Sequence, residues 1–145
     1  MKKPLKVFVD SDVVISSLLS KSGAAYILIH GTKLNLQLFI SHVSYKELIL
    51  VTERLGLSKN ELMDLTRKKF KMAKLKTGLN KLKEEYADYV TDANDAHIVG
   101  GVVTAKARFL ISYNLKHFKT DKIKADFGII ITSPALLLQY LRSIT

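Results

Sequence analysis

Four short, strongly apolar segments recur along this chain, each about as long as a single β-strand. Segments that are apolar throughout and rich in Val and Ile are typical of strands buried on both faces, as in parallel sheets. Between them, apolar residues recur every three or four positions, which indicates helices. This alternation predicts an α/β fold with three layers, α/β/α, around a central parallel sheet of four to five strands. The apolar segments cover residues 5–9, 36–40, 109–111 and 129–131.

The size and composition of the chain predict one compact domain spanning residues 1–145, because 48% of the residues are hydrophobic and no linker-like stretch or repeat interrupts them. The absence of cysteine excludes disulfides, thiol catalysis and cysteine-ligated metals, and it suits an intracellular protein. Lys2 and Lys3 precede an apolar stretch, as in a secretory signal, but a signal core or membrane span would have to bury Asp10 and Asp12. We therefore expect a cytoplasmic protein that does not enter a membrane.

Two helix starts carry distinctive local signals. Ser58 followed by Glu61 forms a capping box, and Ser133 followed by Pro134 marks the start of the last helix. Further helices are expected over residues 11–19, from about 22 to 30, from 44 onwards and after 95. The last of these contains Gly100 and Gly101, and such small residues predict that it packs closely against its neighbours.

Acidic and amide side chains follow or closely trail the apolar segments. Asp10 ends the first segment, and Asn114 trails the third. Glu47 lies in the helix after the second segment, and Asp95 begins the helix before the third. Because the carboxyl ends of parallel strands gather at one crevice, we expect these side chains to converge there. Their oxygens suit Mg²⁺ or Mn²⁺, so the pattern predicts a metal site, with Asp92 as a further ligand.

Each of these residues also has a purely structural explanation. Asp10 and the neighbouring Asp12 can cap the first helix, and Asp92 or Asp95 can cap the later one. Asn114 can satisfy a turn, and a lone glutamate on a helix is usually solvated. The residues expected to support the site through hydrogen bonds are Ser11, Asp12, Ser44 and Ser112. The histidines lack the paired spacing of zinc ligands, and we interpret them as surface or structural residues. They are His30, His42, His97 and His117.

The charge of the chain is strongly unbalanced, with a formal net charge of +10. Residues 67–83 contain basic but no acidic side chains. Such a segment can neutralise RNA phosphates, and binding would then weaken steeply as salt rises. A solvated helix face is the alternative explanation. The candidate RNA-binding residues are Arg67, Lys68, Lys69, Lys71, Lys74, Lys76, Lys116 and Lys119.

Four blocks of sequence, in order, resemble the PIN domain, a family of small metal-dependent nucleases that includes the toxins of VapBC-type toxin–antitoxin pairs. The blocks are VFVDSDVVISSLL, SHVSYKELI, NDAHIVGGVVTAKARFLISYNLKHF and GIIITSPALLL. The resemblance runs nearly end to end, and it places Asp10, Glu47, Asp95 and Asn114 at the family's catalytic positions. The chain departs from the family pattern at two of its positions. Asn114 stands where many members carry Asp, and Asp12 stands where Asn is usual.

The resemblance implies a metal-dependent endoribonuclease that cuts single-stranded or loop RNA and leaves a 5′-phosphate, with a metal-bound water as the nucleophile. It also implies the toxin of a type II toxin–antitoxin pair, acting as a homodimer whose antitoxin blocks the carboxylate pocket. An acidic antitoxin segment is then a second candidate for the basic surface.

Three alternatives remain open at this point. The chain can be a PIN-fold nuclease of RNA processing, or a catalytically weakened module that binds RNA or protein. The segment around Asp10 also resembles the opening of haloacid-dehalogenase-like phosphatases, whose first Asp attacks phosphorus. That family's late acidic pair is missing here, because the last apolar segment runs into Thr132, Ser133 and Pro134.

Overall fold

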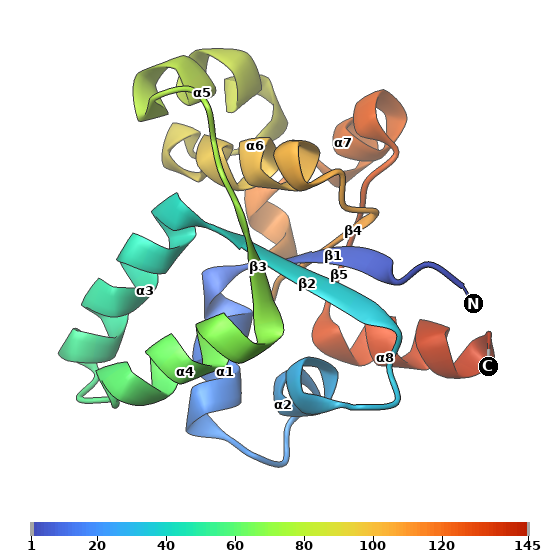
Figure 1. Ribbon diagram of the computed structural model, residues 1–145. Coiled ribbons are helices and arrows are strands. Elements are labelled where there is room, and N and C mark those ends of the chain that lie inside the picture. Colours follow the sequence, from blue (N-terminus) through green and yellow to red (C-terminus); the bar gives the residue numbers. More distant parts are fainter. Residues whose placement is uncertain (1, 145) are drawn as a thin grey trace.

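The computed structural model describes residues 2–144, which form a five-stranded parallel sheet flanked by helices (Figure 1). The strand order is β3-β2-β1-β4-β5, and every neighbouring pair is parallel, which confirms the predicted fold class. The chain runs from β1 to one edge of the sheet and then returns to the other edge, so the order reverses between β1 and β4. The strands are β1 Leu5–Val9, β2 Leu36–Ser41, β3 Phe70–Ala73, β4 Phe109–Ile111 and β5 Ile130–Thr132.

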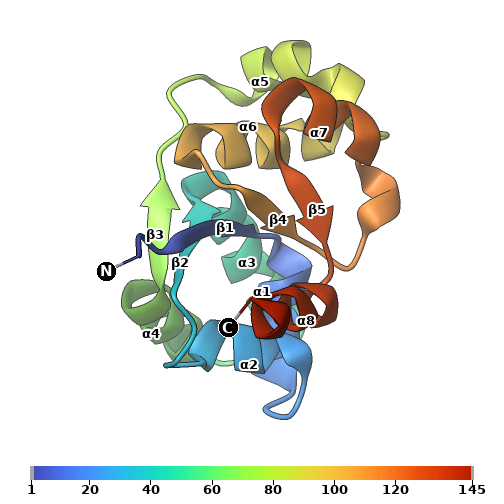
Figure 2. The same ribbon diagram turned by 90° about the vertical axis from the view of Figure 1, so that its right-hand side faces the viewer.

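Helices cover both faces of the sheet and create two hydrophobic cores (Figure 2). Because successive side chains of a strand point to opposite faces, Val7 and Val9 enter one core and Phe8 enters the other. The first core receives α1, α2, α3, α4 and α8, and the second receives α6 and α7, with α5 packed outside α6. The helices are α1 Ser11–Leu19, α2 Ala24–His30, α3 His42–Arg54, α4 Lys59–Lys69, α5 Leu79–Tyr86, α6 Ala96–Ala105, α7 Thr120–Phe127 and α8 Pro134–Ser143.

The predicted helix starts are confirmed by their capping hydrogen bonds. The Ser58 hydroxyl oxygen accepts from the backbone N–H of Glu61 at 3.2 Å, and that of Ser133 accepts from Leu136 at 3.3 Å, with Pro134 in the first turn. The helix expected from residue 44 begins earlier, at His42, because the Ser41 side chain caps it.

Three elements were not predicted from the sequence, namely the edge strand β3 and the helices α5 and α7. β3 has only four residues and includes Lys71, so its sequence does not stand out from the basic segment around it. Basic residues at an exposed sheet edge are common, because they discourage pairing with another chain. The last strand and the second helix also differ from prediction by one or two residues at their starts.

Helix α6 lies unusually close to the sheet, as its small residues predicted. A Cβ atom on Gly101 would lie 2.7 Å from the ring of Phe8, and one on Gly100 would lie 2.9 Å from Leu82. These glycines therefore set the position of α6 against β1 and α5. The N-terminus of α6, which begins directly after Asp95, is thereby held next to the carboxyl edge of the sheet.

No single helix within residues 2–144 is long and apolar enough to cross a membrane. Helices α1 and α2 meet that test only as a pair, which is bent by 98°.

Candidate active site

Asp10 lies at the carboxyl end of β1, where the strand order reverses between β1 and β4. Open parallel sheets bind ligands at such switch points. Its backbone N–H donates to Ile111 at the end of β4 (2.9 Å), and its side chain caps α1 by accepting from the N–H of Ser11 (2.8 Å). The second carboxylate oxygen accepts from the Ser112 hydroxyl at 2.7 Å. Asp10 is 9% exposed. The capping role and a site role are therefore compatible in one residue.

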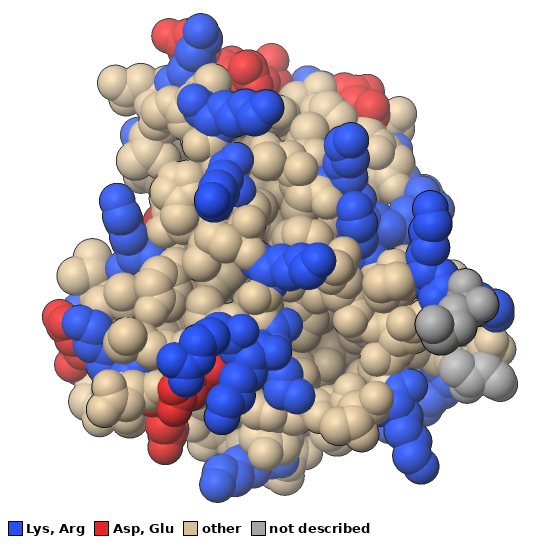
Figure 3. Space-filling view, viewed as in Figure 1, with Lys and Arg blue, Asp and Glu red and all other residues tan. Residues whose placement is uncertain are grey.

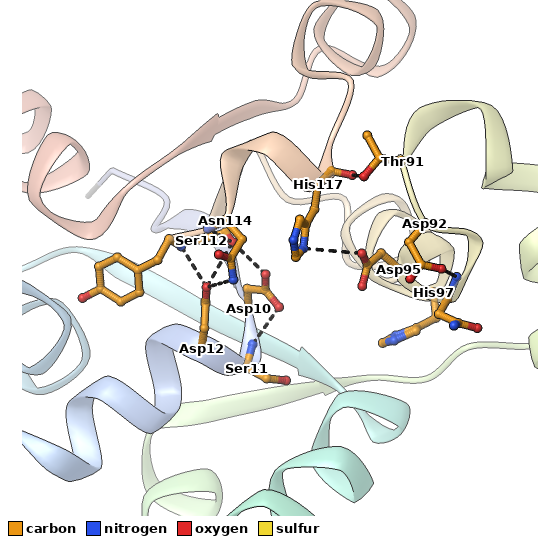
Figure 4. Close-up of polar contacts among 12 residues, drawn as sticks. Asp10, Ser11, Asp12, Thr91, Asp92, Asp95, His97, Ser112, Asn114 and His117 are labelled. Atoms are coloured by element: carbon orange, nitrogen blue, oxygen red, sulfur yellow. Dashed lines mark hydrogen bonds and ion pairs between the residues drawn. The ribbon is translucent and has the colours of Figure 1, made fainter.

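Asp12 and Asn114 join Asp10 in a hydrogen-bonded group that links α1 to the end of β4 (Figure 4). Oδ2 of Asp12 accepts from the Asn114 side-chain amide at 2.9 Å and from the Tyr113 backbone N–H at 3.0 Å. The Ser112 hydroxyl lies 3.5 Å from the same oxygen, but its proton is committed to the shorter bond with Asp10. Oδ1 of Asp12 is buried without a hydrogen-bond partner among the described residues. The group thus contains two carboxylates and one unsatisfied oxygen.

Burial and neighbouring negative charge make these carboxylates hard to ionise. Desolvation is the main cause that raises the pKa of Asp10 to about 6, and the negative charges of Asp12 and Asp95 add to it. Hydrogen bonds from Ser112 and Ser11 oppose this shift. Burial also raises the pKa of Asp12. A bound cation would favour the ionised forms, so the electrostatics of this group suit a cation.

Asp95 forms the other side of the site, at the start of α6. Its Oδ2 lies 3.5 Å from Nδ1 of His117, in the short helix Leu115–His117 that follows β4 (Figure 4). Burial raises the pKa of Asp95, while His117 lowers it and the charges of Asp92 and Glu47 raise it further. The Asp92 side chain itself accepts from the N–H of Asn94 at 2.9 Å. Asp92 therefore caps the turn before α6, as the structural alternative predicted.

Glu47 reaches the site from α3 and is held by a buried histidine. Its Oε1 lies 3.0 Å from Nε2 of His97, whose side chain is only 6% exposed. Nδ1 of His97 is buried without a hydrogen-bond partner within residues 2–144. The contacts of His97 with Glu47 and of His117 with Asp95 were not predicted from the sequence. Each contact joins two elements that are distant in sequence, so no local spacing signals it.

The remaining supporting residues are only partly where they were expected. Ser112 contacts Asp10 directly, and the backbone of Ser11 does so as well. Ser44, in contrast, is buried at the start of α3, where its backbone N–H donates to the Ser41 hydroxyl at 3.0 Å. Ser44 therefore belongs to the cap of α3.

The donor set fits a hard divalent cation, although it is not a closed coordination shell. Within residues 2–144, no three His, Asp or Glu side chains converge closely enough to hold a metal ion as they stand. The carboxylates are nevertheless close enough to interact, because the charges of Asp12 and Asp95 add to the burial that raises the pKa of Asp10, and the charge of Glu47 adds to the burial that raises the pKa of Asp95. Oxygen donors of this kind are the ligands of Mg²⁺ and Mn²⁺.

The candidate RNA-binding residues fall into two groups. Lys116 and Lys119 follow Asn114 closely in sequence, in and just after the short helix Leu115–His117. The others lie in the last turn of α4, in β3 and just beyond it, on a face that carries many basic and few acidic side chains (Figure 3). Arg67 differs from these lysines because an acidic side chain already pairs with it, in an exposed ion pair with Asp64 at 2.8 Å.

Comparison with known proteins supports this description. The family model for the PIN domain matches residues 6–116. The fold is similar to VapBC2 from Rickettsia felis bound to a promoter DNA fragment, with a TM-score of 0.60 and 14% identity over 88% of this chain and 97% of that chain. It is also similar to FitAcB from Neisseria gonorrhoeae, with a TM-score of 0.58 and 15% identity over 89% and 98%.

A third similar structure is Mycobacterium tuberculosis VapC20, described as a sarcin-ricin loop cleaving toxin. Its TM-score is 0.53 at 14% identity, and the match covers 83% of this chain and 95% of that chain. At such low identity these likenesses concern the fold alone. No curated protein sequence matches the chain significantly.

Proposed function

Because this chain belongs to the PIN domain family, we propose that it is a metal-dependent endoribonuclease that hydrolyses RNA phosphodiester bonds. The observation that carries the proposal is the state of Asp10, which is buried at the switch point of the sheet beside further carboxylates. Buried carboxylates that oppose one another's ionisation are costly to a fold, and they cluster at functional sites. PIN nucleases typically depend on a metal, and a cation offsets this cost.

The chain's own residues would hold Mg²⁺ or Mn²⁺ from three directions. Asp10 presents a carboxylate fixed by Ser112 and by the start of α1. Asp95 presents a carboxylate from the start of α6. Glu47 presents another from α3, where His97 of α6 orients it. Asp92 and the side-chain oxygen of Asn114 are the further ligands of the proposal. Hydrolysis needs an activated water and neutralisation of the leaving oxygen, and a divalent cation supplies both when it is bound.

RNA would approach this site through the basic residues near it. Lys116 and Lys119 lie closest in sequence to Asn114, and His117 between them contacts Asp95. The lysines of α4 and β3 would then contact more distant phosphates. An acidic antitoxin segment is the competing partner for the same surface.

The more specific part of the proposal is the toxin role. Similar structures include a VapBC complex and a protein described as a toxin, which supports a toxin component of a type II pair. In this proposal the protein is a homodimer and its antitoxin covers the carboxylate pocket. A short acidic-tailed DNA-binding protein encoded next to this chain would support that role, and an unrelated neighbour would weaken it.

One observation favours a different function, that of a module that binds RNA without cutting it. Glu47 is engaged by His97, and no three carboxylate or imidazole groups in the described part of the chain form a ready metal site. Activity and binding must therefore be measured separately.

The experiment compares the wild type with Asp10→Asn in the presence and absence of Mn²⁺. Cleavage of a labelled RNA and Mn²⁺ uptake by calorimetry are the two measurements. Asp121→Asn, which removes an exposed carboxylate from α7, is the matched control. We expect the wild type and the control to bind Mn²⁺ and cut RNA, and Asp10→Asn to lose both. RNA binding without any cleavage or Mn²⁺ uptake by the wild type would favour the binding module.

A further inference from the structure

The contact between Asp12 and Asn114 suggests which of the two residues carries the negative charge at this side of the site. The Asn114 side-chain amide donates to Oδ2 of Asp12 at 2.9 Å, so the two residues form one carboxylate–amide pair across α1 and β4 (Figure 4). The neighbouring Tyr113 N–H donates to the same oxygen at 3.0 Å. The pair is therefore fixed in one orientation, with Asp12 as the acceptor.

The other oxygen of Asp12 makes no hydrogen bond of regular geometry within residues 2–144, although the backbone N–H of Val13 also favours the ionised carboxylate. Oδ1 is buried and lacks a hydrogen bond among the described residues, and an unpaired buried carboxylate oxygen is costly. Capping does not explain this carboxylate, because Asp10 already caps α1 through the N–H of Ser11. A cation close to this carboxylate would offset the cost of its buried charge.

We propose that Asp12 supplies the carboxylate on this side of the site and that Asn114 positions it. This inference rests on the proposed function, because it assigns roles to residues around the same cation. Asn114 contributes its amide N–H to Asp12 and so orients the carboxylate. It is a positioning residue in this scheme, and its own oxygen is secondary.

The test exchanges the two side chains and measures Mn²⁺ affinity by calorimetry as well as RNA cleavage. Asp12→Asn should weaken Mn²⁺ binding by about tenfold or more. The double variant Asp12→Asn with Asn114→Asp restores one carboxylate and one amide in the same contact, and it should recover most of the lost affinity. Thermal unfolding of each variant controls for loss of structure, and Asp121→Asn controls for net charge.

The outcomes separate this inference from the proposed function. A wild type that binds no Mn²⁺ and cuts no RNA refutes both. If the wild type is active and Asp12→Asn binds Mn²⁺ as tightly as the wild type, only the role of Asp12 is refuted. A double variant as weak as Asp12→Asn, although folded, refutes the exchange of roles across the pair.

A second feature, at the opposite edge of the sheet, carries an independent inference. A groove of about 680 Å³ lies at the amino ends of the central strands, and no Asp or Glu among residues 2–144 lines it. Tyr140 lies in this groove, 46% exposed, with its ring packed against Phe109 at 5.6 Å between centroids. The basic residues that line the groove are Lys2, Lys3, Lys6, Lys33, Lys106 and Arg108. We call this surface the rear groove.

Lys106 occupies a backbone conformation that is unfavourable for lysine. It ends α6 with φ 55° and ψ 38°, in the left-handed region that favours glycine. A lysine kept where glycine would be less strained suggests that its charge is used.

We infer that the rear groove binds a single-stranded segment of RNA outside the segment that is cut. Cations around an exposed aromatic ring are the combination that binds single strands, since phosphates pair with the cations and a base stacks on the ring. The groove lies at Leu5, at the start of β1, and Asp10 follows the end of this strand. The two sites are thus roughly 16 Å apart along the strand.

The test measures binding of a labelled RNA of about 20 nucleotides to variants that also carry Asp10→Asn, which prevents cleavage. Lys3→Glu with Lys33→Glu should weaken binding much more than Lys21→Glu with Lys124→Glu, an equal charge change on exposed residues outside the groove. Tyr140→Ala should weaken binding without changing the charge. Lys106→Gly should weaken binding without lowering the melting temperature.

Equal losses from the two lysine pairs would refute the groove, since they would reflect net charge alone. Full affinity in Tyr140→Ala would also refute it. An acidic peptide could also displace RNA from the wild type but not, at similar concentration, from the lysine variant. That result would identify a protein segment as the occupant of the groove and refute its assignment to RNA.

Discussion

The clearest quantitative prediction concerns the cost of the ionised Asp10 carboxylate to the folded protein. The pKa of this group rises from 3.8 in a solvated chain to about 6 in the folded one, mainly because it is buried. At about 1.36 kcal/mol per pKa unit, this amounts to about 3 kcal/mol. That is a large fraction of the stability of a small domain.

The sign of the effect follows from proton binding. Between pH 3.8 and about 6, the folded protein holds the Asp10 proton more tightly than the unfolded chain does. The free energy of unfolding therefore falls as pH rises through this window, and the full cost is present above it. Asp12 and Asp95, whose pKa values are also raised by burial, act in the same direction.

Asp10→Asn keeps the shape of the side chain and removes its charge. Without divalent metal at neutral pH, we expect the variant to be more stable than the wild type by about 2 to 3 kcal/mol, and this advantage should vanish towards pH 4. Urea unfolding in EDTA at a series of pH values measures the difference. Added Mn²⁺ should stabilise the wild type and leave the variant nearly unchanged.

A variant that is less stable than the wild type at neutral pH in EDTA would refute this reasoning. The hydrogen bonds from Ser112 and Ser11 would then outweigh desolvation. A stability difference that does not change with pH would show that the charge of Asp10 is not its cause.

Three further predictions address the surroundings of the site. Gly101→Ala places a Cβ 2.7 Å from the ring of Phe8, so the free energy of unfolding measured in urea should fall by about 1–3 kcal/mol. The added Cβ of Gly78→Ala meets nothing within 4 Å, so this control variant should show no loss from such a clash. Glu47→Gln should retain the melting temperature but lower Mn²⁺-dependent cleavage about tenfold or more, and equal rates would exclude Glu47 from the site. Ser112→Ala removes the 2.7 Å hydrogen bond to the buried aspartate after β1, and cleavage assays should show a loss of about 10- to 100-fold; an unchanged rate would contradict its supporting role.

Much of the fold was predictable because its signals are local. β1 and β4 are continuous apolar runs buried on both faces, and Ser58 and Ser133 cap the helices that follow them. β3 was not predictable in this way. It pairs only with β2 and has one exposed edge, so it needs few apolar residues and can tolerate Lys71.

The site, too, has a part that was predictable from the sequence and a part that was not. Asp10 and Asn114 follow neighbouring central strands, so chain topology alone brings them together. The orientation of their side chains depends on Ser112, whose hydroxyl donates to Asp10 and accepts from the N–H of Asn114. The pairing of Glu47 with His97 depends on how α3 and α6 approach each other. Such distances come from packing, and no spacing in the sequence encodes them.

The electrostatics of the whole chain explain how this costly site can coexist with a basic surface. The formal net charge is +10, yet burial and neighbouring carboxylates raise the pKa values of Asp10 and Asp95. The lysines on the surface are too well solvated to offset that cost. A cation in the pocket would offset it at close range, and the surface lysines would then act on a different group, the RNA phosphates. Charge reversal of surface lysines should therefore change RNA affinity and its salt dependence, while Mn²⁺ affinity stays nearly constant. A parallel loss of Mn²⁺ affinity would mean that the two charge systems are coupled.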